Sequence, residues 1–140
     1  MNKTWVCHTI LDLKKLAVFF STLLKPGDIV ALEGFLGSGK TEFARSVIHS
    51  LCGSDILVSS PTFNLMQVYK ASGFSIYHFD LYRLDKFYQI EELGMNDIFF
   101  NSVSLIEWPD RLGLALPRCS YLLKIKISSD CKSRFITILK

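Results

Sequence analysis

The stretch LEGFLGSGKTEF at 32–43 holds glycines, a lysine and a threonine at the spacing G-x-x-x-x-G-K-[ST], which is typical of a phosphate-binding P-loop. The glycines let the backbone curl so that successive N–H groups point inward at phosphate oxygens. Lys40 would then reach the β- and γ-phosphates, and the Thr41 hydroxyl would coordinate Mg²⁺. The residues expected to bind a nucleotide are Gly34, Gly37, Ser38, Gly39, Lys40 and Thr41.

A site of this kind also needs a carboxylate near its metal ion. Asp80 ends the apolar segment FSIYHFD, and Glu107 ends the apolar segment VSLIE. The carboxyl ends of parallel strands meet at the edge of the sheet where a phosphate loop also lies. We therefore expect Asp80 and Glu107 to share the binding of Mg²⁺ and the positioning of water. For either residue taken singly, a solvated strand end is the alternative.

The nucleotide class follows by exclusion. The sequence has no N-K-x-D stretch, which disfavours a Ras-like GTPase. Its arginines are dispersed singly, whereas a small-molecule kinase usually brings several of them in a lid over the phosphates. We expect an adenine nucleotide, ATP, together with Mg²⁺.

A P-loop must lie between a strand and a helix. The β-branched, apolar run DIVALEG (28–34) ends in glycine and predicts a buried strand. From Lys40 onward, apolar residues recur at helical spacing between Phe43 and Leu51, and Gly53 is placed to end this helix. Both neighbouring elements are therefore predicted.

The remaining segments predict a mixed sheet. Residues 9–24 have the apolar spacing of an amphipathic helix, with Thr9 and Asp12 at capping-box spacing. The further expected elements are a hairpin of NLMQVYK and FSIYHFD turning at Gly73, a short helix from Asp85 through Phe87, Ile90 and Leu93 to Gly94, a strand VSLIEW, and a final antiparallel pair YLLKIKI and RFITILK. The fold class is α/β: a single P-loop NTPase-like domain over residues 1–140, with a mixed, mainly parallel sheet flanked by helices.

Composition sets further bounds. The chain has 140 residues, 49% hydrophobic and 21% charged, which suits one well-cored domain. Its four cysteines lack C-x-x-C spacing, which excludes a zinc ribbon, and the net charge of +3 is too small to argue for nucleic-acid binding. The apolar run at 16–24 is too short to span a bilayer. We expect a cytosolic protein with no membrane or DNA partner.

Four stretches, in this order, resemble the TsaE (YjeE) family of P-loop ATPases of tRNA threonylcarbamoyladenosine synthesis: GFLGSGKT, SSPTFNLMQVY, YHFDLYRL and LIEWPDRL. As a set they are much more specific than the P-loop alone. The resemblance implies that Thr41 and Glu107 are the Mg²⁺ ligands and that Asp80 is a second carboxylate near the γ-phosphate. It also implies that Thr62, in SPTF, is a switch-type threonine that senses this phosphate.

The resemblance further implies partners. A TsaD–TsaB-type transferase pair and TsaC would make and transfer the threonylcarbamoyl group, and this chain would hydrolyse ATP to reset the transferase, touching tRNA indirectly or weakly. Hydrolysis would be slow in the isolated chain. Two alternatives stay open: a nucleotide-dependent binding module with incidental hydrolysis, and a small-molecule P-loop kinase.

Several positions have two interpretations. Trp108 is similar to a family tryptophan but also fits a core aromatic, and His78 fits a packed, hydrogen-bonded histidine better than a catalytic base. Phe35 stands where the family usually has Asp, so a carboxylate is missing from the rim of the site. The segment CKSRF only loosely resembles the family's last basic stretch, which leaves the roles of Lys132 and Arg134 open.

Overall fold

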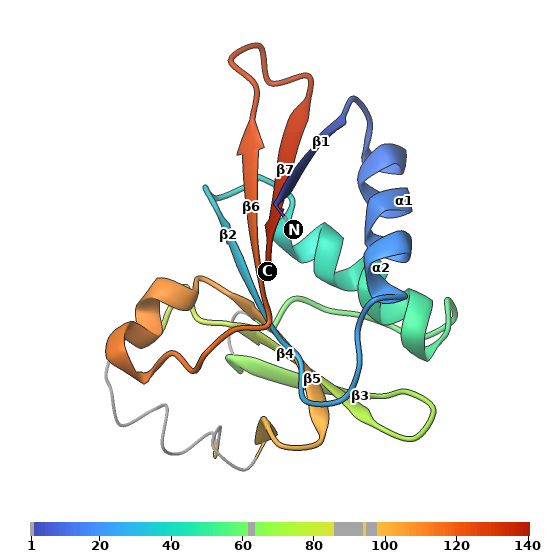
Figure 1. The fold of residues 1–140 in the computed structure, drawn as a ribbon, viewed down its shortest axis with the longest axis vertical. Helices are drawn as coiled ribbons and strands as arrows, with labels where there is room; N and C mark the ends of the chain where they lie inside the picture. Colours follow the sequence, from blue (N-terminus) through green and yellow to red (C-terminus); the bar gives the residue numbers. More distant parts are fainter. Residues whose placement is uncertain (1, 62–63, 86–93, 95–97) are drawn as a thin grey trace.

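A seven-stranded sheet runs through the part of the chain that the computed structural model describes, residues 2–61, 64–85, 94 and 98–140 (Figure 1). Its strands lie in the order β1-β7-β6-β2-β5-β4-β3. Their bounds are β1 Lys3–Cys7, β2 Ile29–Gly34, β3 Met66–Lys70, β4 Ser75–Asp80, β5 Ser102–Glu107, β6 Tyr121–Ile127 and β7 Arg134–Leu139.

The sheet is mixed. Its centre is parallel, because β2 pairs in parallel with both β5 and β6, and β4 pairs in parallel with β5. The antiparallel pairs are β3 with β4, β6 with β7, and β1 with β7, so only β3 and β7 run against the other described strands. The predicted α/β class with a mixed, mainly parallel sheet is confirmed.

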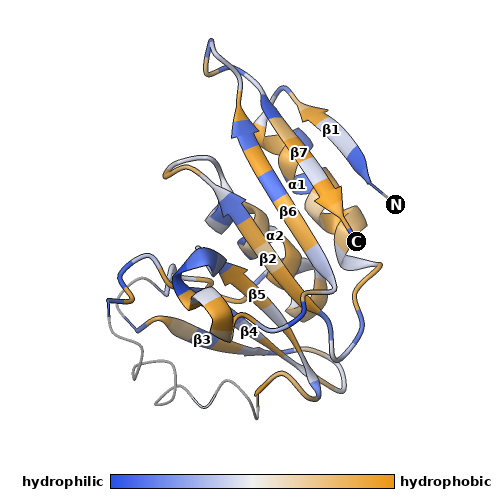
Figure 2. Cartoon of the chain, turned by 60° about the vertical axis from the view of Figure 1, so that its left-hand side comes forward, coloured by the Kyte–Doolittle hydropathy of each residue, from blue (hydrophilic) through white to orange (hydrophobic). Residues whose placement is uncertain are grey.

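In the described part of the chain, a layer of α-helices covers one face of the sheet, as both views show (Figures 1 and 2). They are α1 (Ile10–Ser21) and α2 (Lys40–Cys52), and the ring of Phe20 in α1 packs against the ring of Phe43 in α2 with centroids 5.8 Å apart. The main core lies under them and includes Leu13, Phe20, Val30, Leu32, Phe43, Val47, Ile76, Val103, Leu105, Leu123 and Ile136. The helical layer thus rests on the strands that carry the predicted site.

The opposite face has a smaller core. There Phe79 and Ile106 pack with Leu112 of the 3₁₀ helix η1 (Pro109–Ala115). Figure 2 shows hydrophobic and hydrophilic residues alternating along β6, which is the pattern of a strand with one buried face.

The predicted capping box of α1 is confirmed. Thr9 is the N-cap: its hydroxyl accepts from the Asp12 N–H at 3.1 Å, and the Asp12 carboxylate accepts from the Thr9 N–H at 3.1 Å. The helix ends at Ser21 rather than at 24. Its last turn tightens because the N–H and the hydroxyl of Thr22 both donate to the Phe19 carbonyl.

We expect Thr9→Ala to lower the free energy of unfolding by about 1 kcal/mol, since the substitution leaves an N-terminal N–H of α1 without its acceptor. Urea denaturation checks this, with Ser129→Ala as a control that removes an exposed hydroxyl in the turn between β6 and β7, outside the helix cap. Equal stability of Thr9→Ala and wild type would show that the cap does not hold this helix.

The hairpin and the final antiparallel pair are confirmed. Two elements were not predicted from the sequence: β1, which pairs with β7 at the sheet edge, and η1. Most of the expected short helix from Asp85 lies outside the described residues. Within the described ranges, the structure contains no helix with the length and apolar character needed to cross a membrane.

Candidate nucleotide-binding site

The loop between β2 and α2 is built around two glycines. A Cβ at Gly34 would lie 2.5 Å from the Ser38 hydroxyl and 2.7 Å from the Ile125 carbonyl, so no larger residue fits there. Gly39 has φ +113°, a backbone conformation that L side chains rarely adopt. The close approach and the turn both require glycine, and together they bring the chain from the end of a strand to the start of a helix.

The loop suits an anion. The first N–H groups of α2, from Lys40 onward, have no partner within the helix, and they open onto a cavity of about 330 Å³. The Ser38 hydroxyl is buried and has no hydrogen-bond partner among the described residues. The cavity is bounded by the loop, by the first turns of α2 and by the residues at the ends of β4 and β5. A phosphate group in this cavity would accept from the backbone N–H groups at the start of α2.

Lys40 lies at the mouth of the loop with only 5% of its surface exposed. Its ammonium donates to the carbonyls of Gly34 (2.6 Å) and Phe35 (2.9 Å) and lies 4.3 Å from the centre of the Trp108 ring. Burial lowers the pKa of Lys40, and the nearby carboxylates, Glu107 foremost, oppose this shift. The cation is therefore held by groups that a phosphate can replace.

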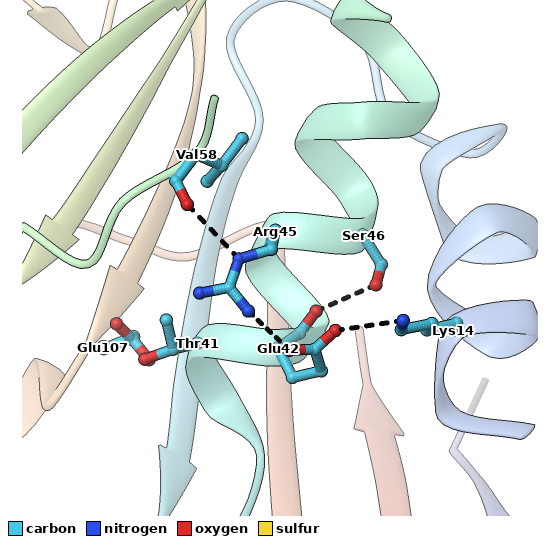
Figure 3. A network of polar contacts seen from close by, with 7 residues as sticks. All are labelled: Lys14, Thr41, Glu42, Arg45, Ser46, Val58 and Glu107. Carbon is cyan, nitrogen blue, oxygen red and sulfur yellow. Dashed lines mark hydrogen bonds and ion pairs between the residues drawn. The ribbon is translucent and has the colours of Figure 1, made fainter. Parts of the chain in front are cut away.

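Thr41 and Glu107 are in direct contact. The Thr41 hydroxyl donates to Glu107 Oε1 at 2.7 Å, joining the first turn of α2 to the last residue of β5 (Figure 3). Glu107 is 1% exposed. The structure thus brings together the two residues expected to hold Mg²⁺.

Asp80 lies on the strand beside Glu107. The two residues are paired in the parallel register of β4 and β5, and both line the cavity. The Asp80 carboxylate accepts from the Tyr82 N–H at 3.1 Å, which fixes its direction at the strand end. This placement agrees with the expectation that both carboxylates lie at the same edge of the sheet.

These oxygen donors suit Mg²⁺, which is usually held by one or two carboxylates together with substrate phosphates. The described residues include no group of three or more His, Cys, Asp or Glu that could hold a metal ion by themselves. Thr41 and Glu107 would therefore hold Mg²⁺ jointly with the nucleotide. The bound ion would neutralise charge on the phosphates.

Trp108 follows Glu107 and forms a wall of the cavity. Its backbone is left-handed (φ 58°), which turns the chain sharply at the start of η1. Its ring packs against the smaller core and lies 4.9 Å from the ring of Tyr82. Trp108 is thus both a packed aromatic and a contact of the Lys40 ammonium.

Comparison with known proteins identifies the family. The family model described as threonylcarbamoyl adenosine biosynthesis protein TsaE matches residues 7–136 of this chain. The chain belongs to the TsaE family. The resemblance seen in the motifs is thereby confirmed.

Individual TsaE proteins match to different extents. The tRNA threonylcarbamoyladenosine biosynthesis protein TsaE of Rickettsia conorii is 50% identical over 71% of this chain, and the chain covers only 57% of that relative's length. The Rickettsia bellii protein of the same name is 39% identical over 94% of this chain and 92% of its own length. The crystal structure of Bacillus subtilis YdiB is 27% identical and superposes with a TM-score of 0.79 over 99% of this chain and 84% of that one.

Three further residues were singled out by the TsaE resemblance, and each has a different outcome. Thr62 lies outside the described residues. Phe35 is 84% exposed at the loop. Arg134, whose role the sequence left open, donates from Nε to the Ser38 carbonyl at 2.7 Å, so β7 supports the loop backbone.

Arg45 and Tyr82 were not predicted to belong to the site, yet both line the cavity. Arg45 lies one turn after Thr41 on α2, and this i,i+4 spacing puts both on one helix face. Its guanidinium pairs with Glu42 at 2.5 Å and donates to the Val58 carbonyl at 3.3 Å (Figure 3). The i,i+4 spacing from Thr41 could have predicted Arg45 from the sequence. For Tyr82 the sequence gives no indication other than its position two residues after Asp80.

Proposed function

We propose that the chain is a Mg²⁺-dependent ATPase that acts in threonylcarbamoyladenosine modification of tRNA by resetting a TsaD–TsaB-type transferase complex. It touches tRNA indirectly or weakly and acts in the cytoplasm. Thr41 and Glu107 bind the metal, Lys40 binds the β- and γ-phosphates, and Asp80 positions the attacking water.

The hydrogen bond between Thr41 and Glu107 carries the ATPase part of this proposal. It puts a hydroxyl from the start of the phosphate-loop helix and a buried carboxylate from the neighbouring strand at one point. Burying a charged carboxylate costs free energy. A glycine-rich turn that bound no nucleotide would gain nothing to offset this cost, whereas a metal-binding site would. The second carboxylate, Asp80, also lines the cavity. Metal binding and the positioning of water can therefore be assigned to different carboxylates.

The pairing of the arginine that lines the cavity supports the proposal that the isolated chain hydrolyses ATP slowly. Arg45 is the arginine that lines the cavity in the described part of the chain, and its guanidinium is held by Glu42 and by the Val58 carbonyl. It is therefore not free to act as an arginine finger on the γ-phosphate. A partner would supply the missing stabilisation.

The exposed side chain of Phe35 suggests where the partner binds. Phe35 and its neighbour Leu36 project from the loop with little protein cover, and a second, mainly apolar hollow beside Phe35 is bounded by Trp108 and Ile125. Exposed apolar side chains that adjoin a site are typical of a protein contact. We propose that this face meets the transferase.

Separate substitutions of the two carboxylates test the ATPase assignment. We expect Glu107→Gln to lose the Mg²⁺ dependence of ATP binding, since the amide is a poor metal ligand. We expect Asp80→Asn to keep ATP binding and to lose about 10²–10⁴-fold in turnover, the usual contribution of a positioned base.

Calorimetry with and without Mg²⁺ and steady-state phosphate release measure the two effects. Asp55→Asn, an exposed carboxylate at the far end of α2, is the matched control and should behave as wild type. Unchanged binding and hydrolysis in both site variants would return Asp80 and Glu107 to a structural role.

A further inference from the structure

His78 lies directly beneath the proposed metal site. It is on β4, two residues before Asp80, and side chains of a strand alternate between faces, so it shares the α2 side of the sheet with Asp80 and with the core residue Ile76. Its side chain is 0% exposed. A polar ring in such a place needs a partner, because burial without a hydrogen bond is costly.

That partner is Glu107. His78 Nε2 lies 3.1 Å from Glu107 Oε2, while Glu107 Oε1 accepts from the Thr41 hydroxyl at 2.7 Å. The two carboxylate oxygens are therefore held separately, one from β4 and the other from α2. Because both contacts act on one buried carboxylate, they fix its plane.

The direction of this contact follows from the groups involved. A carboxylate oxygen only accepts, so His78 Nε2 carries the proton and donates to Glu107 Oε2. The other ring nitrogen, Nδ1, is buried and has no hydrogen-bond partner within the described residues. In that part of the chain, the contact with Glu107 is therefore what orients the ring.

We infer that His78 is a positioning residue for the metal site: its Nε2–H holds Glu107 Oε2 so that Oε1 faces Thr41 and the bound Mg²⁺. This inference rests on the proposed function, because it assigns Glu107 to the metal. Side chains that orient a metal ligand through a hydrogen bond usually contribute about 10–100-fold to metal affinity. His78 itself takes no part in the chemistry.

The test compares His78→Leu with His78→Gln. Leucine fills the space without a donor, whereas the glutamine amide carries an N–H at a reach similar to that of Nε2. We expect His78→Leu to weaken the apparent Mg²⁺ affinity of the ATP complex by about 10–100-fold and to leave ATP binding in EDTA unchanged. His78→Gln should stay close to wild type.

Calorimetric Mg²⁺ titrations of the ATP complex give this readout without relying on turnover. Phe79→Leu is the matched control, since it perturbs the same strand from its opposite face and does not touch Glu107. If His78→Leu does not fold, His78→Met replaces it as the apolar variant without a donor.

Three results are informative. Wild-type Mg²⁺ affinity in the apolar variant, or an equal loss in the glutamine variant, would overturn the inference and leave the proposed function standing. Wild-type protein whose ATP binding does not depend on Mg²⁺ would overturn the proposed function itself.

Discussion

Lys40→Ala should abolish ATP hydrolysis and remove most of the ATP affinity. The Lys40 ammonium is the cation at the mouth of the loop, and in this structure it is held by two loop carbonyls and the Trp108 ring. When phosphate replaces the carbonyls, the ammonium pairs with charge that grows in the transition state, where such electrostatic contacts contribute most. Alanine cannot supply this contact.

The loss should not come from unfolding. Burial lowers the pKa of Lys40, so in the folded state the charged form is disfavoured, and this cost applies at every pH below the folded pKa. Removing the charge removes this desolvation cost but also the hydrogen bonds to the Gly34 and Phe35 carbonyls, so the two effects on stability oppose each other. Lys40→Met keeps the apolar stem of the side chain and should be as inactive as Lys40→Ala, and a thermal melt of each variant shows whether it is folded at the assay temperature.

Thr41→Ala provides the contrast. It removes a metal ligand but leaves the N–H groups of the loop in place, so it should weaken the Mg²⁺-dependent part of ATP binding and spare the rest. Calorimetry and steady-state phosphate release distinguish the two variants. Wild-type ATP affinity and turnover in Lys40→Ala would refute the assignment of this loop as the nucleotide site.

Addition of the cognate transferase pair should stimulate ATP hydrolysis strongly. Groups supplied in trans, such as an arginine finger, contribute roughly 10³–10⁵-fold to turnover in NTPases that depend on them. Arg45, the arginine at the cavity of the described chain, is already paired with Glu42 and the Val58 carbonyl. We therefore expect slow hydrolysis by the isolated chain and fast hydrolysis in the complex.

Phe35 provides the means to locate the contact. Phe35→Ala should reduce the stimulation by the transferase. Phe100→Ala is the control. The side chain of Phe100 is similarly exposed (89%), but Phe100 precedes β5 and therefore lies at the amino end of that strand, whereas the loop lies at the carboxyl ends of the strands. Full activity of the isolated chain, unchanged when the transferase is added, would favour a self-sufficient enzyme. ATP-dependent complex formation without stimulated hydrolysis would favour a binding module.

Local patterns in the sequence were enough to predict most of the elements. The G-x-x-x-x-G-K-[ST] spacing, the Thr9–Asp12 cap and the turn at Gly73 depend on residues within a few positions of one another, and the structure has all three features. The strand-end positions of Asp80 and Glu107 also followed from local apolar runs. Short-range hydrogen bonds and backbone conformations decide such features, so a linear sequence carries them.

Contacts between distant segments were decided by the tertiary structure alone. The sequence indicates that His78 faces one side of a strand, but only the register of β4 on β5 brings it to Glu107. Likewise β7 must return beside β6 before Arg134 can reach the Ser38 carbonyl, and β1 forms only because β7 offers it an edge. Strand periodicity fixes which face a side chain takes, whereas register and strand order depend on how the whole sheet packs under α1 and α2.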